Sequence, residues 1–149
     1  MGFGGILLRI VVVDGQGGGI GRALVERIRR EAELADAELI CVGTNAIATS
    51  AMLRAGAAQG ATGENAVVVC CRDADVIAGP IGIVLKDAML GEITPAMAEA
   101  VAGSRAERVL IPVARWHPHV AGYEAAPLSQ LVEHAVRTIV RLRAKLATD

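Results

Sequence analysis

Continuous apolar runs recur along this chain, and between them apolar residues are spaced three or four positions apart. The runs at residues 7–13, 37–42, 75–80 and 107–113 are rich in Val, Ile and Leu. Strands buried on both faces of a parallel sheet have this composition. We therefore predict four strands at these positions.

The stretches between the runs have helical patterns. Ile20, Leu24 and Ile28 share one face of a first helix that extends to about residue 35. Thr94-Pro95 is a helix start, because it combines a capping hydroxyl with proline at the first helical position. Outside residues 57–79, the expected helices are residues 20–35, 46–55, 83–90, 95–102 and the amphipathic C-terminal 127–146.

Residues 57–79 allow two interpretations. Residues 65–71 are rich in β-branched side chains and could form a strand, which would then make an antiparallel hairpin with 75–80. Alternatively, residues 58–61 are a short strand and Thr62 caps a helix over residues 63–73. We favour the helix, because it preserves the βαβ alternation and its right-handed crossovers.

The alternation predicts an α/β fold: a three-layer, Rossmann-like, mostly parallel sheet with helices on both faces. The sequence contains no internal repeat, low-complexity segment or linker. Residues 1–149 are therefore expected to form a single domain, with an edge strand near Val120–Tyr123 as a possible addition. That length is sufficient for a hydrophobic core.

A glycine-rich turn follows the first strand. Residues 14–21 read Asp-Gly-Gln-Gly-Gly-Gly-Ile-Gly and lie between the strand and the first helix, with Gly15, Gly19 and Gly21 in the spacing Gly-x3-Gly-x-Gly. Glycine lets a ligand approach the backbone closely, and a helix start presents unpaired N–H groups. Together they predict binding of an anion, most often a phosphate. The expected cofactor is a nucleotide or dinucleotide, with NAD(P) as one possibility.

The ligand of an open parallel sheet lies beyond the carboxyl ends of the strands. The residues expected there are glycines and short polar side chains, which suit a site that binds through backbone amides. These candidate binding residues are Asp14, Gly15, Gln16, Gly17, Gly18, Gly19, Ile20, Gly21, Thr44, Asn45, Thr62, Gly63, Asn65, Gly79, Pro80 and Gly82.

Three carboxylates are candidate acid–base groups, although each also has a simpler explanation. Asp14 is expected to order the glycine turn by accepting amide hydrogen bonds. Glu64 could instead stabilise the dipole of the helix that it begins. Glu92 could close over the site, but we expect it to be a solvated loop charge. Thr44 and Asn45 are equally well explained as caps of the next helix.

The overall composition and net charge limit the kinds of partner that are expected for this chain. The formal net charge is −1 and the pI about 6.3, so neither nucleic acid nor a membrane surface is an expected partner. Hydrophobic residues make up 53% of the chain, which predicts self-association into a homo-oligomer. Three cysteines without metal-type spacing indicate reduced thiols in the cytoplasm. No metal site is expected, since His117 and His119 would need a third ligand from elsewhere.

Residues 7–33 resemble the short-chain dehydrogenases, and the run Gly-Ile-Gly-Arg-Ala-Leu at 19–24 is close to theirs. The resemblance implies a nicotinamide cofactor. However, their catalytic Tyr-x3-Lys has no counterpart, because the only Tyr is Tyr123 and no Lys follows it at that spacing. Thr44-Asn45 stands where the family has an acidic ribose ligand. Standard dehydrogenase chemistry is therefore excluded.

A second resemblance covers nearly the whole chain. It is carried by residues 14–21, 43–53, 60–66, 79–83 and 88–98, the last of which reads Ala-Met-Leu-Gly-Glu-Ile-Thr-Pro-Ala-Met-Ala. These segments are similar to a family of short bacterial proteins that is catalogued only as a domain of unknown function. The resemblance implies no activity, substrate or catalytic residue.

Overall fold

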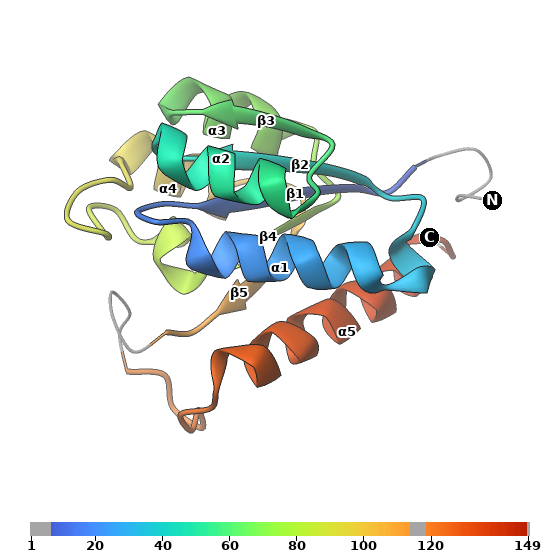
Figure 1. Ribbon diagram of the computed structural model, residues 1–149. Helices are drawn as coiled ribbons and strands as arrows, with labels where there is room; N and C mark the ends of the chain where they lie inside the picture. Colours follow the sequence, from blue (N-terminus) through green and yellow to red (C-terminus); the bar gives the residue numbers. More distant parts are fainter. Residues whose placement is uncertain (1–6, 114–118, 149) are drawn as a thin grey trace.

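The computed structural model describes residues 7–113 and 119–148. The described residues form one α/β domain around a sheet of five strands, all parallel, in the order β3-β2-β1-β4-β5 (Figure 1). The strands are β1 (Arg9–Asp14), β2 (Glu38–Gly43), β3 (Gln59–Thr62), β4 (Val76–Pro80) and β5 (Glu107–Ile111). The chain extends the sheet outward from β1 to β3 and then returns to place β4 on the other side of β1. The strand order thus reverses between β1 and β4.

In residues 7–113 and 119–148, five α-helices flank the sheet, and two single 3₁₀ turns lie between elements. The helices are α1 (Gly19–Arg30), α2 (Ala46–Ala55), α3 (Glu64–Arg72), α4 (Pro95–Ala102) and α5 (Leu128–Leu146). The 3₁₀ turns are η1 (Ala32–Leu34) and η2 (Ile81–Val84). In the described part of the chain, no helix is both long and apolar enough to span a lipid bilayer.

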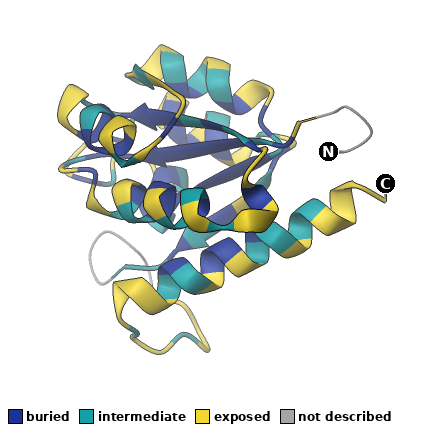
Figure 2. Cartoon of the chain, turned by 45° about the vertical axis from the view of Figure 1, so that its right-hand side comes forward, coloured by how far each residue is buried: buried dark blue, intermediate teal, exposed yellow. Residues whose placement is uncertain are grey.

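The helices cover both faces of the sheet, so the domain has three layers. Successive side chains of a strand point to opposite faces, and β1 is apolar on both. Ile10 and Val12 belong to the core shared with α1, α2 and α5, whereas Val11 and Val13 belong to the core shared with α3 and α4. Figure 2 shows the central strands almost entirely buried between these layers. The expected three-layer, Rossmann-like architecture is confirmed.

The helical interpretation of residues 63–73 is also confirmed, because α3 occupies Glu64–Arg72 and no hairpin forms. Its expected cap is wrong. Gly63 stands at the N-cap without a side-chain hydrogen bond, and the Thr62 hydroxyl instead lies 2.7 Å from that of Thr49. Thr94 does cap α4 as expected, accepting a hydrogen bond from the amide of Met97.

Two other expectations are corrected. Residues 83–90 are not a helix: after η2 the chain makes turns in which Asp87, Met89 and Leu90 have positive φ, a backbone conformation that cannot continue a right-handed helix. Residues 120–123 form a turn closed by the Tyr123 amide on the Val120 carbonyl rather than an edge strand. His117 lies outside the described residues.

Candidate functional site

The glycine turn connects β1 to α1 at the carboxyl edge of the sheet. Gln16 and Gly18 have φ of 49° and 74°, so the turn reverses direction through the left-handed region. At Gly18 a Cβ would lie 2.8 Å from Cα of Ala48 in α2, and glycine is therefore required both for its conformation and for this close approach. The turn packs against α2, and α1 begins at the crevice.

Asp14, the last residue of β1, holds this turn together. Its carboxylate is buried and accepts the amides of Gly15 and Gly21, each at 2.7 Å, through different oxygens. One side chain therefore ties the end of β1 to the first turn of α1. The expectation that Asp14 orders the turn through amide hydrogen bonds is confirmed.

Burial also changes the acidity of Asp14. Loss of solvent raises its pKa, hydrogen bonds from Gly21, Gly15 and Ile20 lower it, and the nearby charge of Glu92 raises it again. The net effect is a pKa of about 6, well above the usual 3.8. Asp14 therefore changes charge close to neutral pH.

Glu92 reaches the same turn from the segment after η2. Its Oε1 accepts three hydrogen bonds: from the Gln16 amide at 2.9 Å, the Thr44 hydroxyl at 2.6 Å and the Asn45 side-chain amide at 2.9 Å. The expectation of a solvated loop charge is wrong. The donors attract the carboxylate into the space between the ends of β1 and β2.

The ionised form of Glu92 is favoured in this position. Partial burial raises its pKa, but the hydrogen bonds from Thr44, Gln16 and Asn45 together outweigh burial, so the pKa lies below its usual value. Glu92 is consequently a fixed negative charge at neutral pH.

The segment that carries Glu92 is tightly folded. Besides Asp87, Met89 and Leu90, Gly91 also has positive φ. Backbone hydrogen bonds from Asp87 to Ile93 and from Ile93 to Ala88 close the turns, and Met89 and Ile93 are buried in the core shared with α3 and α4. Non-glycine residues in this conformation cost free energy, and here packing and hydrogen bonding maintain it.

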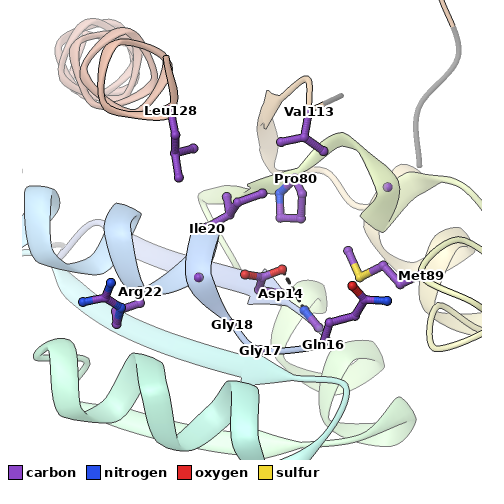
Figure 3. A pocket seen from close by; sticks show the side chains of 13 residues that line it. Asp14, Gln16, Gly17, Gly18, Ile20, Arg22, Pro80, Met89, Val113 and Leu128 are labelled. Carbon is purple, nitrogen blue, oxygen red and sulfur yellow. Dashed lines mark hydrogen bonds between the residues drawn. The ribbon is translucent and has the colours of Figure 1, made fainter. Parts of the chain in front are cut away.

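A cavity of about 490 Å³ lies beside the turn, over β1 and β4, where the strand order reverses. Most of its lining is the glycine turn and apolar side chains. In Figure 3, Ile20 and Leu128 lie opposite Met89 and Gln16, with Pro80 and Val113 between them. The lining residues are Asp14, Gly15, Gln16, Gly17, Gly18, Gly19, Ile20, Arg22, Pro80, Gly82, Met89, Val113 and Leu128.

The lining of this cavity includes two residues whose backbone amides lack a partner in the described chain. Among the described residues, no acceptor is found for the amides of Gly17 and Gly19, whereas the Gly18 amide is used within the turn. A Cβ at either Gly17 or Gly19 would meet nothing within 4 Å, so the space in front of these residues is open. The Arg22 side chain, half-exposed and paired with Glu26 at 3.0 Å, borders the same space.

The structure divides the residues expected at the crevice into separate groups. Residues 14–20 of the turn, Pro80 and Gly82 line the cavity, whereas Gly21 is buried against Met52. Gly79 is buried below them, where a Cβ would lie 2.2 Å from the Val13 carbonyl oxygen. Thr44 and Asn45 bind Glu92 instead, and Asn45 also caps α2 through the Ala48 amide.

The remaining expected residues lie away from the cavity. Thr62 pairs with Thr49, and Gly63, Glu64 and Asn65 begin α3 with the two side chains exposed. Sequence reasoning missed three of the described lining residues: Arg22, Met89 and Leu128. Leu128 could have been found, since the start of the last helix follows β5 and returns to the same edge of the sheet.

Comparison with known proteins identifies a family. A family model described as a domain of unknown function, DUF3842, matches residues 9–144. No curated protein and no solved structure matches the chain. The matched range includes the whole of the sheet, the glycine turn, Glu92 and nearly all of α5.

Proposed function

We propose that this chain, which belongs to the DUF3842 family, binds a phosphate-bearing small molecule in the cavity beside the glycine turn. Nucleotides and other phosphorylated compounds are the candidate ligands. The observation that carries the proposal is the position of the cavity, since it lies at the carboxyl ends of β1 and β4, where the strand order reverses. Open α/β sheets bind their ligands at this point.

The polar side of the cavity suits an anion. The amides of Gly17 and Gly19 donate to no group in the described chain, and Gly19 begins α1, whose dipole favours negative charge. Arg22, one turn further along, supplies the only positively charged side chain among the described lining residues. A phosphate bound to the two amides could accept a charge-assisted hydrogen bond from this guanidinium.

The proposal is tested by calorimetric titration with inorganic phosphate and a panel of phosphate esters. Arg22→Ala should weaken binding roughly tenfold or more, since a hydrogen bond to a charged group contributes about 1.5–3 kcal/mol. Gly19→Ala should fold normally, because its methyl group meets no atom within 4 Å, and should weaken binding because it adds a methyl group at a residue that lines the cavity. Arg30→Ala, on the same helix but outside this cavity, is the control. Absence of saturable binding by every phosphate compound would refute the proposal.

Catalysis is a second candidate, favoured by the acidity of Asp14. A carboxyl group with a pKa of about 6 in the cavity lining suits a general acid or base near neutral pH. Glu64 does not line the cavity, and Glu92 is saturated at one oxygen by three donors. For a phosphorylated substrate found in the titrations, Asp14→Asn should lower kcat by roughly 100-fold or more. An unchanged kcat would exclude this role.

Self-association in the cytoplasm is also part of the proposal. Ile47 is 70% exposed and Leu90 is 82% exposed, which is unfavourable for large apolar side chains in water. The described structure has all three cysteines as free thiols, which suits a reducing compartment. Sedimentation equilibrium should give a multiple of 15.4 kDa. A monomer at every concentration would contradict self-association.

A further inference from the structure

The proposed function leaves open which phosphate compounds fit, and the position of Glu92 narrows the choice. We infer that Glu92 closes the half of the crevice over β1 and β2 and thereby excludes dinucleotides, leaving a site for a monophosphate ester with an apolar body. This inference rests on the proposed function and assigns Glu92 as a specificity-determining residue.

The Glu92 carboxylate lies where dinucleotide-binding proteins bind a ribose. In dinucleotide-binding sheets an acidic residue at the end of the second strand binds the ribose hydroxyls. Here β2 ends at Gly43 and is followed by Thr44 and Asn45, so that acid is absent. Glu92 arrives at this place from a segment beyond β4 and takes the Thr44 hydroxyl and the Asn45 side-chain amide as donors. The groups that could recognise a ribose are occupied by the protein itself.

The space beside Gly15 is already filled by side chains of the protein. A Cβ on Gly15 would lie 2.7 Å from Sδ of Met89, 2.7 Å from Oγ1 of Thr44 and 3.1 Å from Oε1 of Glu92. Glycine at this position therefore makes room for the protein's own side chains. A ribose approaching the first glycine of the turn would have to displace them. By contrast, the space before Gly17 and Gly19 is open.

The negative charge of Glu92 opposes a second anionic group. Glu92 is ionised at neutral pH, because its hydrogen bonds hold its pKa below the usual value. A second phosphate directed toward β2, such as the 2′-phosphate of NADP, would meet this negative charge. The site thus tolerates one anionic group at Gly17 and Gly19 and opposes another beside Thr44.

The side chains that line the open half of the crevice indicate the chemistry of the part of the ligand that is not phosphate. The walls of this half, over β1 and β4, are largely apolar, formed by Ile20, Pro80, Met89, Val113 and Leu128. Such walls stabilise an apolar group. An aromatic phosphate monoester has both the anion and the apolar body that this half of the crevice accommodates.

Calorimetric titration of the full chain with phenyl phosphate, inorganic phosphate and NAD tests the inference. Wild type should bind phenyl phosphate at least tenfold more tightly than inorganic phosphate and should show no saturable binding of NAD. Glu92→Ala should gain saturable NAD binding, at least tenfold stronger than any wild-type signal, while keeping its affinity for phenyl phosphate. Glu99→Ala, which removes an exposed carboxylate on α4, should behave as wild type.

Glu92→Gln makes the test independent of whether the alanine variant folds. Glutamine keeps the volume and an acceptor oxygen for the three donors, so it should fold and continue to exclude NAD. NAD binding by wild type or Glu92→Gln with the strength of phenyl phosphate would overturn the inference, as would a folded Glu92→Ala that still excludes NAD. If no variant binds any of the three compounds, the proposed function itself fails.

Discussion

Replacing Asp14 by Asn should remove a specific part of the pH dependence of stability. The folded protein holds this carboxyl at a pKa of about 6 against the usual 3.8, because burial opposes its ionisation. The folded state therefore binds a proton more readily than the unfolded state between these two values. Proton binding to Asp14 therefore stabilises the folded state at low pH. This contribution to the free energy of unfolding is fully present below pH 3.8 and is lost as the pH rises through 6.

The magnitude follows from the same two values. The full shift corresponds to about 3 kcal/mol. Between pH 5 and pH 7.5, integration of proton binding to the folded and unfolded states gives roughly 1 kcal/mol, with greater stability at pH 5. Asparagine does not titrate, so Asp14→Asn should lack this difference whatever its stability at any single pH.

Urea unfolding at pH 5 and pH 7.5 measures the effect as a difference between wild type and variant. Asp73→Asn, which neutralises an exposed carboxylate at the end of α3, should keep the wild-type difference. In wild type, the carboxyl carbon of Asp14 should titrate by NMR with a midpoint near 6. Identical pH dependence in wild type and Asp14→Asn, together with a midpoint near 4, would refute the reasoning.

Three further predictions concern packing, capping and thiol reactivity. Gly43→Ala should lower the free energy of unfolding by about 1–3 kcal/mol or more in urea titrations. The new Cβ would lie 2.4 Å from Oγ1 and 2.5 Å from the amide nitrogen of Thr49. An unchanged urea midpoint would contradict this prediction. Thr94→Ala should cost about 1 kcal/mol by the same assay, since it removes the α4 cap, while Thr94→Ser should retain most of the stability. Iodoacetamide should alkylate half-buried Cys70 before Cys71, whose pKa burial raises to about 12; equal rates by mass spectrometry would be inconsistent with the structure.

Much of the fold follows from local patterns in the sequence. The apolar runs identify β1, β2, β4 and β5, because a strand covered on both faces must be apolar at successive positions. Residues 65–71 are the informative exception. Their β-branched side chains favour a strand, yet they form α3, because the parallel topology needs a helix between β3 and β4.

The candidate site was only partly accessible from sequence. The glycine turn and the role of Asp14 depend on neighbouring residues, and both were predicted. Glu92 is a candidate from sequence, but the sequence favours a solvated loop charge. Its actual partners could not be identified, because Asn45 and Thr44 lie 47 and 48 positions away from Glu92 along the chain. The left-handed backbone at Met89 and Leu90 also has no local signal, since it is maintained by tertiary packing rather than by residue preference.

Amide chemical shifts of the ¹⁵N-labelled chain, measured during titration with phenyl phosphate, test the central claim most directly. Saturable shifts are expected at Gly17 and Gly19, whose N–H groups have no acceptor among the described residues, and small changes at Thr44 and Asn45, which donate to Glu92. Absence of any saturable shift at Gly17 and Gly19 would contradict the claim that the glycine turn binds phosphate.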